Sequence, residues 1–235
     1  MTTTQPSMTQ TAAERIRQTL YDLSRPLFIK QMGWALLFWA FLMINLVINI
    51  QFLRTNYPNP PQPPDLILDI IPETKAFIGL AEILASAETI VIVFILWQRR
   101  FKDAPKLVFL VGMMFWIRGY VILLTPLAQI QPPSLNYPES HFIAQTFYHG
   151  MFYSGHTASA FIQAFYMKGS RLRPVVFILA TTQAFSLLAS HSHYSIDVVG
   201  GLFVAYFITH FDFMRLVPKP LLGVKWMPWY SVENS

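Results

Sequence analysis

The 235 residues of the chain are 54% hydrophobic and only 12% charged, and the apolar residues occur in long blocks. This composition excludes an ordinary soluble domain and predicts an integral membrane protein with several spans. The absence of cysteine excludes disulfide bonds and metal-thiolate sites, and the net charge of +5 indicates membrane orientation and contact with anionic lipid rather than binding of nucleic acid.

The N-terminal segment, residues 1–31, is polar or mixed and does not resemble a cleaved signal peptide. Its first eleven residues are rich in Thr and Gln and are predicted to be disordered. Ile16, Leu20 and Leu23 then follow helical spacing, with arginines at other positions. This pattern predicts an amphipathic helix that lies at the membrane surface.

Six apolar segments follow, each near the length of about 20 residues that crosses a bilayer as a helix. They predict an all-α fold, a bundle of six transmembrane helices. Histidine and aspartate residues interrupt or flank the fourth and sixth segments. We expect one membrane catalytic domain, residues 32–214, and a cytoplasmic tail, residues 215–235. The segments are residues 33–52, 76–97, 107–127, 148–167, 174–190 and 195–213.

Lysine and arginine residues predict which face of the bundle is cytoplasmic. With six spans, all of the 17 lysines and arginines except Arg54, Lys75 and Arg118 fall on one side of the membrane. The positive-inside rule therefore predicts that both termini are cytoplasmic. The opposite loops then face the exoplasmic, periplasmic or lumenal side. The first of these has five prolines between positions 58 and 64, followed by Asp65, and the second, residues 129–141, is also rich in proline; both predict stiff, extended chain.

Two short polar motifs stand near the starts of the fourth and sixth apolar segments. They are Ser154-Gly155-His156-Thr157 and His193-Tyr194-Ser195-Ile196-Asp197. The separation between the two histidines fits one helix down, a turn and one helix back, so both imidazoles are expected on the same, outer side. Either histidine alone is more simply explained as a hydrogen-bonded interfacial residue. The pair, together with Asp197, favours a site for phosphoryl transfer.

Each residue of these motifs has a role in such chemistry. On a helix, His193 and Asp197 are at positions i and i+4, so the carboxylate can hold one ring nitrogen while the other attacks phosphorus. Ser154 as a cap and Gly155 let backbone N–H groups face a phosphate. His156 can protonate the leaving oxygen and later deprotonate the acceptor hydroxyl.

Arg118 lies inside the third apolar segment, where an unpaired guanidinium costs at least about 2.5 kcal/mol. It therefore requires an anionic partner, which is either a substrate phosphate or a carboxylate of the second segment, Glu82 or Glu88. The two interpretations are compatible if they apply to different states of the site. The glutamates pair with Arg118 in the empty site and contact a cationic head group in the filled one.

Ser154-Gly155-His156 followed by His193-x-x-x-Asp197 resembles the type 2 phosphatidic acid phosphatase superfamily. The complete motifs resemble its sphingomyelin synthase branch and the plant phosphatidylcholine:diacylglycerol cholinephosphotransferases. The resemblance implies a six-helix membrane bundle in which His193 is the nucleophile, Asp197 orients it and His156 is the acid and base. It implies no metal and no other cofactor.

The likeness extends from the proline-rich first loop, with Pro60, Pro61 and Asp65, through Arg118-Gly119 to about Tyr206, with departures that separate the branches. Val111 and Leu187 stand where the phosphatases carry a lysine and an arginine, and Gly119 stands where they carry a proline after the arginine. Gly150 stands where the sphingomyelin synthases carry an aspartate. A site left with one cation suits a phosphodiester monoanion better than a phosphate monoester dianion.

The expected function is therefore transfer of a phospho-head group, phosphocholine or a relative, through a phosphohistidine intermediate. The partners are a phospholipid donor, a lipid alcohol acceptor of the diacylglycerol or ceramide type, and the bilayer. A lipid phosphate phosphatase, in which water is the acceptor, is the first alternative. A non-catalytic lipid-binding or transport protein that keeps the motifs as polar packing is the second.

Overall fold

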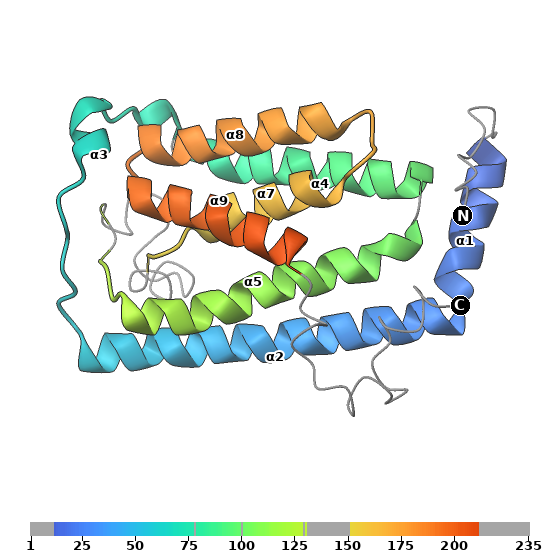
Figure 1. The fold of residues 1–235 in the computed structure, drawn as a ribbon, viewed down its shortest axis with the longest axis horizontal. Helices are drawn as coiled ribbons and strands as arrows, with labels where there is room; N and C mark the ends of the chain where they lie inside the picture. Colours follow the sequence, from blue (N-terminus) through green and yellow to red (C-terminus); the bar gives the residue numbers. More distant parts are fainter. Residues whose placement is uncertain (1–11, 78, 100, 129, 131–150, 212–235) are drawn as a thin grey trace.

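The computed structural model describes residues 12–77, 79–99, 101–128, 130 and 151–211 (Figure 1). Helices dominate this part of the chain, and it contains no β-strand. Three predictions concern residues outside the described part of the chain. They are the disorder of the first eleven residues, the extended second outer loop, of which residue 130 alone is described, and the C-terminal tail. The helices are α1 Ala12–Ser24, α2 Pro26–Asn56, α3 Leu66–Ile70, α4 Leu80–Arg99, α5 Ala104–Leu124, α7 Gly155–Tyr166, α8 Arg173–Ala189 and α9 Ser195–His210, with 3-10 turns at Lys75–Phe77 and Phe101–Asp103.

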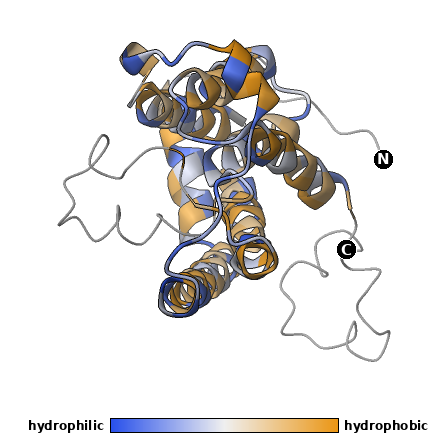
Figure 2. Cartoon of the chain, turned by 90° about the vertical axis from the view of Figure 1, so that its left-hand side faces the viewer, coloured by the Kyte–Doolittle hydropathy of each residue, from blue (hydrophilic) through white to orange (hydrophobic). Residues whose placement is uncertain are grey.

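Two packed groups of helices make up the bundle. Helices α2 and α5 form one long pair, while α7 packs against α8 and α9, and α4 against α8 (Figure 1). Helix α5 also contacts α7, which joins the groups. Most of the helical ribbon has the colours of apolar residues (Figure 2), and large apolar side chains such as Leu37, Ile90 and Phe203 are exposed. This is the pattern expected of a bundle whose outer surface faces lipid.

Among the described residues, three helices are long and apolar enough to cross a membrane: α2, and α4 and α5 each with the 3-10 turn before it. At about 1.5 Å per residue, α2 alone is about 46 Å long, longer than a typical hydrocarbon core. Helices α7, α8 and α9 have only 12, 17 and 16 residues. The expected fourth span, residues 148–167, is helical only from Gly155 within the described residues, because Ser154 caps α7 there.

The predicted amphipathic helix is present as α1, and the apolar residues Ile16, Leu20 and Leu23 on it are exposed. In Figure 1 it runs across the direction of the bundle helices, at the end where α4 finishes and α5 begins. Its position in a membrane surface stays a prediction. The proline-rich segment between α2 and α3 is not helical, as expected.

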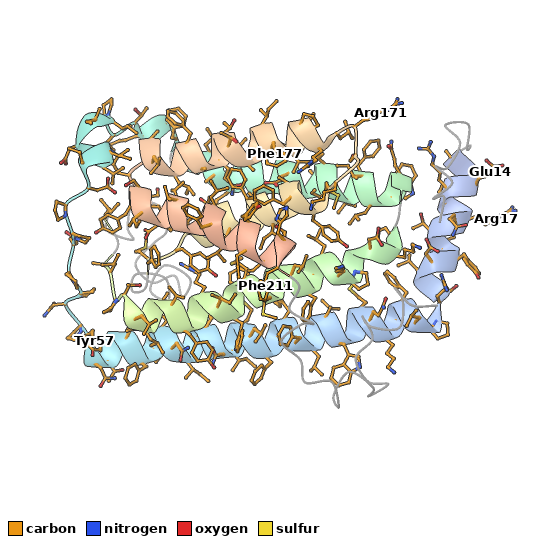
Figure 3. All side chains as sticks on the ribbon, in the orientation of Figure 1. Glu14, Arg17, Tyr57, Arg171, Phe177 and Phe211 are labelled. Carbon is orange, nitrogen blue, oxygen red and sulfur yellow. The ribbon has the colours of Figure 1, made fainter. Side chains whose placement is uncertain are left out.

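The basic loops gather at one end of the bundle. Arg17 and Arg171 lie at this end, whereas Tyr57 lies at the opposite one (Figure 3). Helices α7 and α9, which carry the two histidine motifs at their starts, both begin at the end of Tyr57 (Figure 1). The structure thus separates the histidine motifs from the basic loops, which is the arrangement that the positive-inside rule requires for an outward-facing site.

The orientation can be tested with two single cysteines, because the native chain has none. Asn59 and Lys168 are exposed and lie in loops at opposite ends of the bundle. In sealed cells or oriented vesicles, an impermeant thiol reagent should label Asn59→Cys from the outer side. Lys168→Cys should react only after permeabilisation. The reverse pattern would show that the orientation is inverted.

Candidate active site

Helices α7 and α9 approach each other at backbone distance beside the two motifs. A Cβ atom added at Gly201 would lie 2.8 Å from the main-chain oxygen of Ser154 and 3.1 Å from Cβ of Thr157. A side chain at position 201 would push the two helices apart. The glycine therefore allows the starts of α7 and α9 to pack closely together. Gly201 was not predicted from the sequence to be important, because its role depends on how the two helices cross.

Asp197 connects the two motifs through both its carboxylate and its main chain. Its Oδ2 lies 3.3 Å from Nδ1 of His193 and accepts a 3.2 Å hydrogen bond from the N–H of Tyr194. Its main-chain oxygen accepts a 3.0 Å hydrogen bond from the N–H of Ser154. Asp197 is fully buried. One residue therefore fixes the ring of His193 and the N-cap of the helix that carries His156.

The expected contact between His193 and Asp197 is present, but its origin differs from the prediction. Helix α9 begins at Ser195, so His193 precedes the helix and does not share a helical face with Asp197. Tyr194 is the N-cap, and Asp197, the third helical residue, bonds back to the N–H of this cap. The contact with His193 uses Nδ1, so Nε2 is the ring nitrogen that Asp197 does not engage.

His193 lies in the turn between α8 and α9 and is only 7% exposed. Burial lowers the pKa of its imidazole, and hydrogen bonding and charge attraction from Asp197 oppose this shift. The charges of His156 and Arg118 lower the pKa of His193 further, so both groups lie close enough to act on it. The net direction favours a neutral imidazole near pH 7, the form that has a lone pair for attack.

His156 occupies the first turn of α7 and is more accessible, with 38% of its side chain exposed. Its Nε2 lies 3.0 Å from Oε1 of Glu82, in the first turn of α4. From the sequence, Glu82 was predicted to pair with Arg118 or with a head group, and its contact with His156 was not predicted. No sequence signal marks it, because the two residues meet only when α4 packs beside α7.

Arg118 is buried in α5 and lies beside the first motif. Its Nε donates a 2.8 Å hydrogen bond to the main-chain oxygen of Tyr153. A Cβ added at Gly155 would lie 3.7 Å from Nη1 of Arg118. The hydroxyl of Tyr153 in turn donates to the main-chain oxygen of Met114 at 2.6 Å. These bonds fix the segment before His156 against α5 and place a guanidinium next to it.

Ser154 acts as the N-cap of α7, as its position in the motif predicts. Its Oγ accepts hydrogen bonds from the N–H of Thr157 at 3.3 Å and from the hydroxyl of Thr157 at 3.2 Å. The side chain is fully buried. The role of Ser154 and Gly155 in binding phosphate stays a prediction.

Several buried polar atoms in the described part of the chain lack a hydrogen-bond partner. Both carboxylate oxygens of Glu88 in α4 and both amide atoms of Gln183 in α8 belong to this group, as do Oη of Tyr194 and Oδ1 of Asp197. Glu88 therefore does not hydrogen-bond to Arg118, and that suggested pair is not formed. Buried polar atoms are almost always paired, so these atoms mark where water or a polar substrate group is expected.

Residues 70–213 match the sequence model of the AtPDCT1/2 family. The matched range covers more than half of the chain and contains both histidine motifs, Arg118, Glu82 and Glu88. No curated protein matches the chain.

The helix crossing provides a test of the site geometry. Gly201→Ala forces α7 and α9 apart, because the new methyl group meets backbone rather than a flexible side chain. We expect it to lower the free energy of unfolding by about 1–3 kcal/mol, measured by thermal unfolding in detergent. Gly33→Ala in α2 is the matched control, since its Cβ meets nothing within 4 Å. It should leave stability unchanged or raise it by about 0.5–1 kcal/mol. Equal stability of the two variants would contradict the close crossing.

Proposed function

Because the chain belongs to the AtPDCT1/2 family, the phosphatidylcholine:diacylglycerol cholinephosphotransferases, we propose that it moves phosphocholine from phosphatidylcholine to diacylglycerol in the membrane. The observation that carries the chemical part of this proposal is the His193–Asp197 pair. Asp197 holds Nδ1 of a buried imidazole, with His156 and Arg118 nearby. This arrangement supports a covalent route through His193.

In the first half-reaction, Nε2 of neutral His193 attacks the phosphorus of phosphatidylcholine. The Nε2–P bond forms and the bond from phosphorus to the glycerol oxygen breaks. His156 donates a proton to that oxygen, which leaves as the hydroxyl of diacylglycerol. Asp197 stabilises the positive charge that develops on the imidazole, because its Oδ2 accepts from Nδ1. Phosphocholine is then bound covalently to His193.

The second half-reaction reverses these steps with a different diacylglycerol. His156, now neutral, takes the proton of the acceptor hydroxyl while its oxygen attacks phosphorus, and the Nε2–P bond breaks. Donor product and acceptor belong to the same chemical class, so one site serves both half-reactions. The net result is exchange of the head group between two diacylglycerols, with little difference in free energy between substrates and products.

Arg118 is the proposed phosphate ligand. It lies beside Gly155, and its planar guanidinium can bind two phosphate oxygens through charge-assisted hydrogen bonds. The positions where the resembling phosphatases carry further cations are apolar here, since Val111 is half-buried in α5 and Leu187 is buried in α8. The low positive charge supports a diester substrate, which carries one negative charge, over a monoester.

Glu88 is the better of the two glutamates for contact with the choline cation. Glu82 is already paired with His156, whereas the carboxylate of Glu88 is fully buried and has no hydrogen-bond partner in the described structure. A buried carboxyl group without hydrogen-bond donors is stable in its charged form only beside a cation, and a trimethylammonium group supplies this positive charge without N–H donors. Glu82 instead orients His156 for proton transfer.

The proposed transfer is tested with purified protein in vesicles that contain choline-labelled phosphatidylcholine and a diacylglycerol with distinguishable acyl chains. The label should appear on phosphatidylcholine that carries the acceptor chains. His193→Ala should reduce this exchange by at least about a thousandfold, because it removes the nucleophile. The matched control is His210→Ala, which removes an exposed histidine from the far end of α9 and should keep full exchange.

Each other distribution of the label contradicts the proposal in a defined way. Label released into water as phosphocholine would identify a hydrolase, and label that stays on the donor would identify a non-catalytic protein. In vesicles that also contain ceramide, transfer of the label to ceramide in preference to diacylglycerol would correct the acceptor. Full exchange in a folded His193→Ala protein would eliminate the covalent mechanism.

The role of Glu88 predicts a change in head-group preference. Glu88→Gln keeps the size of the side chain but removes its charge, so the KM for phosphatidylcholine should rise about tenfold relative to that for phosphatidylglycerol, whose head group is uncharged beyond the phosphate. Glu82→Gln is the comparison variant and should lower kcat for both donors equally, since it acts through His156. An unchanged ratio of the two donors in Glu88→Gln would disprove the contact.

A further inference from the structure

Three hydrogen bonds join the first outer loop to the turn that carries His193. Oδ2 of Asp65 accepts from the N–H of Ser195 at 2.6 Å. Nε2 of His191 lies 2.8 Å from the main-chain oxygen of Ile71. In the third, the N–H of Thr74 donates to the main-chain oxygen of Ala189 at 2.8 Å. We name residues 65–74 the clamp segment, because they tie down residues 189–195, which lie at the same end of the bundle (Figure 1).

Asp65 uses both carboxylate oxygens to close two helix starts. Oδ1 accepts from the N–H groups of Ile67 and Leu68 at 3.0 and 3.3 Å and so caps α3. Oδ2 reaches Ser195, 130 residues further along the chain. A cap of the short α3 needs only one of these oxygens. Partial burial acts to raise the pKa of Asp65, but the hydrogen bonds from Ser195, Leu68 and Ile67 outweigh it and lower the pKa, so the carboxylate is ionised.

The bond to Ser195 is adjacent to the catalytic pair. Two consecutive N–H groups at the start of α9 point to two carboxylates: Tyr194 donates to Asp197 and Ser195 donates to Asp65. Asp197 is the same carboxylate that holds Nδ1 of His193. Any rotation of the first turn of α9 that breaks the Asp65 bond therefore also moves the partner of His193.

His193 depends on this turn because it is not part of a helix. It stands between the end of α8 and the start of α9, and the backbone of His191, two residues earlier, is in the left-handed region with φ of 50°. A residue other than glycine is unfavourable in that region unless its surroundings hold it. The bond from the imidazole of His191 to Ile71 in the clamp segment supplies such a restraint.

We propose that Asp65 is a positioning residue for the transfer reaction: through Ser195 it fixes the first turn of α9, so that Nε2 of His193 stays aimed at the substrate phosphorus. This inference rests on the proposed function, in which His193 is the nucleophile. Asp65 lies outside residues 70–213, which match the AtPDCT1/2 family. The clamp segment thereby gives the proline-rich outer loop a function in the reaction beyond that of a linker.

Two single variants break the bond from its two sides. Asp65→Ser keeps a hydroxyl that can cap α3 but is too short to reach Ser195. Ser195→Pro removes the N–H donor at the first position of α9, where proline is well tolerated and where the extended Tyr194 fits a following proline. Asp69→Asn, an exposed carboxylate in α3, is the matched control.

The expected result is a fall in kcat of about 10- to 100-fold in both single variants, while the KM for phosphatidylcholine stays within about twofold, because Arg118 still binds the phosphate. The double variant should be no slower than the slower single variant, since both changes remove the same bond. Asp69→Asn should retain full kcat. Each rate is divided by the folded fraction of the protein, which is determined by thermal unfolding of the same samples in detergent.

Several results would overturn the inference. They are unchanged kcat in both single variants, losses that multiply in the double variant, or losses that match the folded fraction and so reflect stability alone. Failure of the proposed function is distinguishable, because the wild-type protein would then show no exchange of the label. Asp65 has no role in the chemistry if wild type exchanges phosphocholine and Asp65→Ser does so equally fast.

Discussion

The buried carboxylate of Asp197 is the constraint on which the rest of the site depends. It accepts from the ring of His193 and from the cap of its own helix, while its main-chain oxygen accepts from Ser154 of the other motif. These bonds are possible because α7 and α9 touch at Gly201. A buried carboxylate is costly unless hydrogen bonds compensate it, so the three elements that meet here stabilise one another. Arg118 adds the positive charge, held by the chain just before Ser154.

The position of this constraint in the bundle fits a reaction between two lipids. The motifs lie at the end of the bundle away from the basic loops, where α7 and α9 begin, so the proposed reacting groups gather at one end of the bundle (Figure 1). Burial lowers the pKa of His193, and the more accessible His156 faces Glu82. The difference in exposure matches the two proposed tasks: attack from a protected position, and proton exchange with a glycerol oxygen that must arrive and leave.

Sequence patterns predicted the features that depend on local chemistry. Apolar blocks gave the long helices α2, α4 and α5, and the motif around Ser154 correctly indicated a helix cap. The contact of His193 with Asp197 was predicted from helical spacing, yet it is made by the cap of α9 with His193 outside the helix. The pairs Glu82–His156 and Asp65–Ser195 were not predictable, because each joins segments far apart in the chain whose meeting depends on packing. The buried amide of Gln183, which has no hydrogen-bond partner in the described part of the chain, was not predicted from the sequence either.

The most direct measurement of the central claim is to trap the covalent intermediate. The protein is mixed with phosphatidylcholine labelled at phosphorus in the absence of added diacylglycerol, quenched in alkaline detergent, under which phosphohistidine survives, and digested for peptide mapping. Label should appear on the peptide that contains His193, within the time of one turnover, attached to Nε2. Label on His156 would show that His156, and not His193, is the nucleophile. The absence of labelled protein under conditions where exchange proceeds would show that the head group passes directly from lipid to lipid.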